Sequence, residues 1–317
     1  MRKIWNPRAF KSHVSPHELL QEISLRSSKR FTLTTQSDPV DFLSWFINNL
    51  HLSLGGSKTR PGTSIIQKIF QGLLKVESQT ITARADASDR LRFEEAAEIK
   101  SETVRFMMLT LDLPPKPIFK DEQDKNIIPQ VRALSAIAPP LCQLLFFFAD
   151  SEQNLQVPLT TILSKYDGLH SQELLGQRKR YRLLPPLPPF LIFHIKRFSK
   201  NKFVEERNPT IVTFPTRSLD MSPYVEPPRG GSSTEPIWYD LAANITHESI
   251  TTTSGKKEGD IRSVYKVQLM NKANGEWFQI QDLFVEEVAR ELLFTSESYV
   301  QIWQLRREPK GKQTTGQ

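Results

Sequence analysis

Apolar and polar residues alternate along two segments in the last third of the chain, SVYKVQL and EWFQIQD, and the turn NKANG separates them. This period of two predicts a β-hairpin. If Lys272 and Ala273 form the centre of the turn, Val264 lies directly opposite Gln281. The apolar face of this hairpin is expected to pack on the core, and it consists of Tyr265, Val267, Leu269, Phe278 and Ile280.

The first sixty residues follow a helical period instead. Ser15, Pro16 and Glu18 form a helix-start pattern before HELLQEI, and Asp38 is predicted to cap a second helix, PVDFLSWFINNLHLSL. We interpret the large apolar side chains of that helix as core packing because they recur at helical spacing; they are Phe42, Trp45, Phe46 and Leu50.

Longer apolar runs in the middle of the chain predict strands. These runs are IIQKIFQGLLKVES and TVRFMMLTLDL, between Ile65 and Leu113, and the buried strand FLIFHIKRF further on. LTTILSKYDGLH predicts a helix between them. The mixture of separate helices and strands predicts an α+β fold.

Composition places the chain among globular proteins, with 317 residues of which 38% are apolar. No stretch of 18 uncharged apolar residues is present, so we expect a soluble intracellular protein without a membrane segment. The one cysteine, Cys142, excludes an internal disulfide and a cysteine zinc site. The net charge of +7 would suit an acidic or RNA-rich partner, but the basic residues are dispersed, which favours ordinary solvated surface.

Six segments resemble, in the same order, motifs of the ubiquitin-specific protease family: DPVDFL, FQG, FMMLTLDLP, PFLIFHIKRF, YDLAANITH and WFQIQD. The resemblance implies a papain-like α+β cysteine protease fold with thumb, palm and fingers, incomplete at its N-terminus. It implies one domain over residues 1–308 and a disordered tail at 309–317. Its parts would be a thumb remnant at about 1–60, fingers mainly at about 65–110, and a palm at about 111–130 and 157–308.

The same resemblance implies that the catalytic residues have been replaced. In active members the base histidine precedes a tyrosine, and here Val264 precedes Tyr265. The orienting acid lies seventeen residues further on in the family, where this chain has Gln281. Asp282 matches a second acidic position of the family, but it has no base to orient. The box that carries the nucleophile is absent, so no catalytic residue is expected.

The other histidines and the fingers give no alternative chemistry. We interpret His247 and His194 as structural, and His13, His17, His51 and His170 lack metal-ligand spacing. The four zinc-binding cysteines that the family's fingers often carry are missing. We therefore expect neither a metal nor another cofactor.

Further segments, among them IWNPRAFKSHVSPHELL, KDEQDKNIIPQ and YVQIWQLRR, resemble the catalytically inactive spliceosomal branch of this family. That branch implies a nuclear, non-catalytic scaffold in pre-mRNA splicing, with proteins of the tri-snRNP as partners and RNA contacted at most indirectly. Two alternatives stay open: a pseudoenzyme that binds ubiquitin without cutting it, and an active deubiquitinase.

The segment 131–156, VRALSAIAPPLCQLLFFFADSEQNLQ, interrupts a part of the chain that is continuous in the resembled branch. It contains Cys142 and a strongly apolar run without a helical period. Its valine–arginine start, its LLFFF run and its final glutamine are typical of a translated, retained intron, and we favour this origin. The alternative is a genuine insertion that forms a short docking helix.

Overall fold

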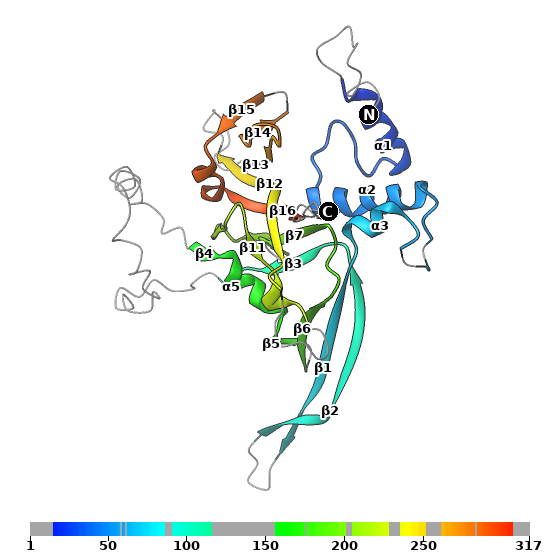
Figure 1. Cartoon of the computed structure of the whole chain (residues 1–317), viewed down its shortest axis with the longest axis vertical. Helices are drawn as coiled ribbons and strands as arrows, with labels where there is room; N and C mark the ends of the chain where they lie inside the picture. Colours follow the sequence, from blue (N-terminus) through cyan, green and yellow to red (C-terminus); the bar gives the residue numbers. More distant parts are fainter. Residues whose placement is uncertain are drawn as a thin grey trace, which may run out of the picture. The chain divides into compact units, whose positions relative to one another are not determined.

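The computed structural model describes residues 15–57, 59–60, 62–85, 91–115, 156–174, 176–200, 205–227, 235–251, 261–282 and 284–306. They belong to two compact units, Met1–Gln67 and Lys68–Gln317 (Figure 1). None of the helices within these ranges has the length and apolar character needed to cross a membrane. The predicted insertion, apart from its last residue, and the predicted tail lie outside the described residues, as do Cys142 and His13.

The first unit contains helices α1 (His17–Arg26) and α2 (Pro39–Ser53). Asp38 Oδ1 accepts a hydrogen bond from the Val40 amide at 2.7 Å, which confirms the predicted cap. Helix α1 begins at His17, one residue later than the predicted start, and Pro16 occupies its N-cap position. The predicted core packing on α2 is partly confirmed: the ring centroids of Phe42 and Trp45 both lie 5.4 Å from that of the buried Phe31, but both side chains are only half-buried.

The predicted strand from Ile65 to Phe70 is wrong, because these residues form helix α3 (Ile65–Phe70). Ser64 Oγ accepts a hydrogen bond from the Gln67 amide at 3.3 Å, as a helix-capping hydroxyl does. Strand pairing begins only at Gly72, where a Cβ atom would lie 2.4 Å from the Phe106 ring. Glycine therefore permits the close approach of the two strands that follow.

A long hairpin of β1 (Gly72–Ala85) and β2 (Leu91–Phe106) dominates the first sheet. It continues through β6 (Gln177–Leu184) and β5 (Asp167–Leu174) in the order β2-β1-β6-β5 (Figure 1). All three interfaces of this sheet are antiparallel.

The larger sheet of the second unit has the strand order β15-β14-β13-β12-β16-β7-β3 (Figure 1). Its strands are β15 (Phe284–Val288), β14 (Trp277–Gln281), β13 (Ile261–Met270), β12 (Trp238–Thr251), β16 (Glu297–Leu305), β7 (Phe190–Lys196) and β3 (Leu109–Asp112). The short β11 (Leu219–Asp220) pairs with β12. Strand β7 confirms the predicted buried strand, with Leu191, Phe193 and Ile195 fully buried.

Shorter elements complete the unit. The predicted helix LTTILSKYDGLH is only partly confirmed, since α5 (Leu159–Leu163) and the 3₁₀ helix η1 (Ser164–Tyr166) end before DGLH, which opens β5. The remaining elements are β4 (Gln156–Pro158), β8 (Phe198–Lys200), β9 (Glu205–Arg207), β10 (Ile211–Thr213) and the 3₁₀ helices η2 (Ser222–Tyr224) and η3 (Arg290–Thr295). Buried side chains of α5, β3, β7, β12 and β16 form one continuous core in which Trp303 is fully buried.

The hairpin predicted from the alternating pattern is present as β13 and β14, but its predicted register is wrong. Val267 pairs with Ile280 and Leu269 with Phe278, so Val264 does not lie opposite Gln281. The predicted turn NKANG ends at Gly275, whereas the observed turn extends from Asn271 to Glu276. The Asn271 amide donates a hydrogen bond to the Glu276 carbonyl at 2.8 Å. This longer turn moves every pair by two residues.

The predicted core face of the hairpin is only partly confirmed: Tyr265 packs its ring on the buried His247 ring, but the main core lies against the other face. Leu269 is 39% exposed, whereas Gln268 and Trp277, on the opposite face, are 1% and 3% exposed. Met270 also packs against the core from that face. The sequence pattern failed here because a glutamine occupies a buried position, which is permitted when its amide group is hydrogen-bonded.

Gln268 belongs to a row of polar side chains that crosses four strands. It accepts a hydrogen bond from Asn244 Nδ2 at 2.8 Å and donates one to Gln279 Oε1 at 3.3 Å. Gln279 in turn donates to Glu286 Oε1 at 2.7 Å. We call these four residues the amide row; it satisfies a polar group that would otherwise be costly to bury.

Truncating one side chain on each face of the hairpin tests which face packs on the main core. We expect Trp277→Ala to lower the free energy of unfolding by about 3–5 kcal/mol, because it leaves a cavity in the core. The matched Leu269→Ala variant should lose about 1 kcal/mol or less, since its side chain is partly solvated. Urea denaturation measures both values, and an equal or larger loss for Leu269→Ala would contradict the assignment.

Candidate functional site

Val264 and Gln281 lie on the same face of the large sheet but are not directly paired. Val264 on β13 is opposite Glu248 of β12, and Gln281 at the end of β14 is opposite Phe284 of β15. Continuing the β13–β14 register places Gln281 opposite Lys266. The two side chains are therefore diagonal neighbours, with Cβ atoms about 7–8 Å apart in an ordinary antiparallel pair.

The carboxylate opposite Val264 already has a partner. Glu248 Oε2 lies 2.6 Å from Lys266 Nζ, and the Glu248 side chain is half exposed. This pair occupies the face on which Val264 lies, between β12 and β13. Valine has no atom that accepts a proton, so Val264 cannot act as a general base, and its nearest charged neighbours form an ion pair with each other. Asp282 lies just beyond β14, in a turn with φ of +52°.

The opposite face of β12 holds a buried histidine next to a carboxylate. His247 Nδ1 lies 3.6 Å from Glu297 Oε2, beyond hydrogen-bond length, and the His247 side chain is fully buried. The His247 ring contacts the Phe198 ring at 5.0 Å and the Tyr265 ring at 5.3 Å. Neither of its nitrogens has a hydrogen-bond partner among the described residues.

One arginine binds Glu297 directly, and a second, buried arginine lies near enough to act on its charge. The Arg207 guanidinium binds both Glu297 oxygens, with Nε 3.1 Å from Oε2. Arg197 is 1% exposed and donates to three carbonyls, those of Ser298 at 2.6 Å, Asn208 at 3.0 Å and Thr210 at 2.7 Å. Burial raises the pKa of Glu297, but His247, Arg207 and Arg197 together lower it below its usual value.

The His247–Glu297 pair is therefore a structural cluster rather than an exposed acid–base pair. Its histidine is enclosed by aromatic rings and its carboxylate is engaged by a guanidinium. His194, on β7, packs its ring against Tyr299 at 5.2 Å. These contacts agree with the structural interpretation that the sequence suggested for both histidines.

Two further histidines have local partners. His51 Nδ1 lies 2.6 Å from Ser64 Oγ and connects helix α2 to the following loop. His170 is exposed, and its Nδ1 lies 2.5 Å from Asp167 Oδ2 within β5. No three histidine, cysteine or acidic side chains gather as metal ligands within the described ranges.

The amide row is the part of this face that the sequence did not reveal. Gln279 lies two residues from Gln281 on β14, and Gln268 lies four residues from Val264 on β13, on the face opposite the one predicted to pack on the core. No spacing motif marks such a row, because its members come from four different strands. Only the pairing of Asn244 with Gln268, and of Gln279 with Glu286, brings them together.

The sequence of the chain is similar to a known protein family and to splicing proteins within it. Residues 1–303 match the family described as ubiquitin carboxyl-terminal hydrolase. The chain is 43% identical over 308 residues to the "Probable mRNA-splicing protein ubp10" of Schizosaccharomyces pombe, covering 96% of the chain and 55% of the relative. It is 38% identical to human "Ubiquitin carboxyl-terminal hydrolase 39", covering 96% and 49%. The chain thus spans about half the length of these relatives.

Two solved structures share the fold. An essential yeast splicing factor aligns with a TM-score of 0.58 and 24% identity, covering 96% of this chain and 57% of that one. The Ubp8/Sgf11/Sus1/Sgf73 module of SAGA, bound to ubiquitin aldehyde, aligns with a TM-score of 0.58 and 16% identity, covering 90% and 53%. Both confirm the predicted α+β fold of the ubiquitin-specific protease type.

Neutralising Glu297 tests the structural role of its cluster. We expect Glu297→Gln to lower the free energy of unfolding at pH 7 by about 1–3 kcal/mol, because the Arg207 guanidinium loses its carboxylate partner and the charge near the buried Arg197 is removed. Since the native pKa of Glu297 lies below its ordinary value of 4.5, this stabilisation is present above pH 4.5 and is lost as the pH falls through the native pKa.

Urea denaturation of the original and variant chains at pH 7 and at pH 3.5 measures the effect. The difference in free energy of unfolding between the original chain and the Glu297→Gln variant should be smaller at pH 3.5 than at pH 7. A free-energy difference that is the same at both pH values would contradict a stabilising role for the ionised Glu297 carboxylate. Glu248→Gln is the matched control, because its side chain is half exposed and bound to a single lysine.

Proposed function

This chain belongs to the ubiquitin carboxyl-terminal hydrolase family, and we propose that it acts in pre-mRNA splicing as a non-catalytic scaffold. The observation that carries the proposal is its 43% identity, over 96% of its length, to an mRNA-splicing protein. A fold shared with a yeast splicing factor supports it. We propose proteins of the spliceosomal tri-snRNP as partners and the nucleus as the location.

The proposed lack of catalysis rests on the side chains at two positions. A general base commonly contributes 10²–10⁴-fold to a reaction rate, and Val264 cannot act as one. Gln281 is neutral, so it could not stabilise a protonated histidine as a carboxylate does. Glu248, the acid opposite Val264, is bound to Lys266. These residues limit acyl-transfer chemistry whatever precedes residue 1 in a longer protein.

The fold offers two separate surfaces for a scaffold. We propose that the β2-β1-β6-β5 sheet corresponds to the family's fingers and the large sheet to its palm. Met1–Gln67 would be the thumb remnant. A protein of this kind keeps its core and uses its outer faces for recognition.

Association with snRNAs tests the splicing proposal. Tagged chain, expressed in its source organism and recovered from nuclear extract, should enrich U4, U5 and U6 RNAs together over an untagged control. The enrichment should survive washing at 150 mM salt and fall as the salt is raised, because a chain of net charge +7 gains from electrostatic contacts. Recovery of ubiquitin conjugates without these RNAs would contradict the proposal.

Restoring the two family residues tests the catalytic part. We expect the Val264→His/Gln281→Asp variant to keep its stability within about 1 kcal/mol, since neither residue belongs to the core. Like the original chain, it should form no covalent adduct with a ubiquitin C-terminal electrophilic probe. A gel shift measures adduct formation. An adduct that disappears in a Cys142→Ala variant would show a working nucleophile and refute this part of the proposal.

A further inference from the structure

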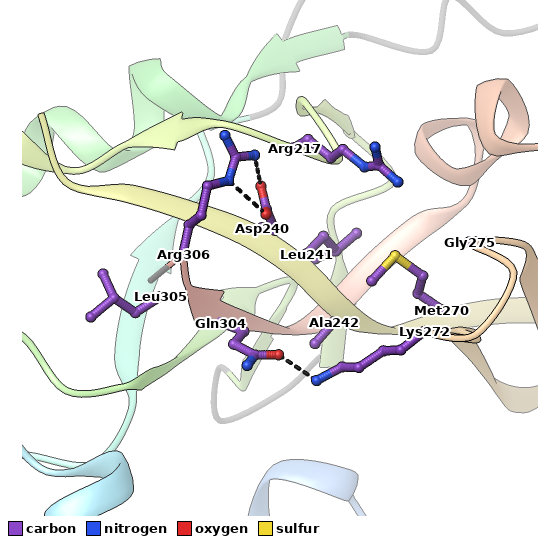
Figure 2. Close-up of a pocket in the computed structure, with 10 residues that line it drawn as sticks. All are labelled: Arg217, Asp240, Leu241, Ala242, Met270, Lys272, Gly275, Gln304, Leu305 and Arg306. Atoms are coloured by element: carbon purple, nitrogen blue, oxygen red, sulfur yellow. Dashed lines mark hydrogen bonds and ion pairs between the residues drawn. The ribbon is translucent and has the colours of Figure 1, made fainter. Parts of the chain in front are cut away.

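A pocket of about 430 Å³ opens at one end of the large sheet (Figure 2). It lies where β12 begins, where β16 ends and where the β13–β14 turn follows Met270. Met270 is six residues from Val264 on the same strand, which corresponds to about 20 Å. The pocket is therefore separate from the positions of the family's catalytic residues.

At the rim of the pocket, Asp240 and Arg306 form an ion pair in which the two charges cancel. Arg306 binds both oxygens of Asp240, with Nε 2.9 Å from Oδ2, and the Ser218 amide donates to Oδ1 at 2.8 Å (Figure 2). Burial raises the pKa of Asp240, but Arg306 and the Ser218 amide outweigh it and lower the pKa. Asp240 therefore stays ionised at neutral pH, and its charge is matched by Arg306.

Two further cations line the pocket: Arg217 lies near enough to Asp240 to help lower the pKa of that carboxyl, and Lys272 has no acidic partner among the described residues. Lys272 Nζ bonds to the neutral Gln304 Oε1 at 2.5 Å (Figure 2). The Arg217 side chain extends from the other side of the pocket toward the β13–β14 turn. Its Nη2 atom lies close to Gly275, at 3.7 Å from the position that a Cβ atom would take there. Neither cation takes part in a salt bridge with any residue that the structure describes. The pocket thus keeps two positive charges available to a ligand.

The floor of the pocket is apolar and irregular. The β12–β16 register shifts between Leu241 and Ala243, so Ala242 has no partner on β16. Such bulges bend a strand and redirect side chains. Ala242 and the half-buried Met270 lie between the two cations (Figure 2). A ligand for this pocket would combine a negative charge with a small apolar group.

We propose that this pocket binds an acidic, partly aliphatic segment of a partner protein. Arg217 and Lys272 would take carboxylates of that segment, and Ala242 and Met270 would contact its aliphatic side chains. The pocket suits a peptide better than single-stranded RNA, because its lining contains no aromatic ring for base stacking. The proposal holds whether or not the chain is catalytic.

Binding of a model peptide to the 317-residue chain tests the proposal. The probe is a fluorescein-labelled hexapeptide of alternating leucine and aspartate, measured by fluorescence anisotropy at 150 mM salt. The neutral control peptide carries asparagine in place of each aspartate. We expect saturable binding of the acidic peptide and at least tenfold weaker binding of the neutral one.

Two double variants separate pocket binding from general charge attraction. Arg217→Ala/Lys272→Ala should weaken acidic-peptide binding about tenfold, with an unchanged circular dichroism spectrum. Lys100→Ala/Arg105→Ala removes the same charge from two exposed positions of β2 and should leave binding within twofold of the original chain.

Three results would overturn the proposal. The first is an absence of saturable peptide binding up to 1 mM. The second is equal weakening by the two double variants, which would mean attraction by net charge alone. The third is binding of a labelled oligouridine that the acidic peptide does not displace and that depends on Arg217 and Lys272, which would make the pocket an RNA site.

Discussion

A row of hydrogen-bonded polar side chains, buried at Asn244 and Gln268, fixes the register of the strands that carry Val264 and Gln281, the positions we propose as the degenerate catalytic ones. Gln268 is 1% exposed, so its amide group must find partners inside the protein. Asn244 and Gln279 supply them from the two neighbouring strands. A slip of β13 by one residue would turn Gln268 out of the row and place Leu269 among polar groups. The unsatisfied amides would cost about 1–3 kcal/mol each, which holds the sheet in one arrangement.

The residues that hold the hairpin in place differ from the two positions proposed to be catalytic in active relatives. The amide row, Trp277 and Met270 hold the hairpin on its core face. Val264 and Gln281 lie in neighbouring rows of the same face and contribute no hydrogen bond to the amide row. Side chains at these two positions can therefore change without loss of the fold, and on the proposed assignment such a change abolishes proton transfer. The Arg197 and Arg207 contacts around Glu297 hold the opposite side of β12 in the same way.

Local sequence signals predicted the parts of the structure that depend on neighbours in the chain. The Asp38 cap and the apolar run of β7 are of this kind, and both are confirmed. The length of the β13–β14 turn and the buried side of the hairpin depend on distant partners. Gln268 looks solvent-facing until Asn244, 24 residues away, is placed beside it. The pocket around Arg217 and Lys272 was missed for the same reason, because its residues come from separate segments.

The central claim is that this hairpin retains the family's frame without a proton acceptor at the base position. Turnover of a ubiquitin C-terminal fluorogenic amide, measured from pH 5 to pH 9 with the longest natural form of the protein, tests it most directly. The account predicts a rate equal to that of buffer at every pH. A protein-dependent rate with a bell-shaped pH profile, reduced by Glu248→Gln, would identify a working base and contradict the account.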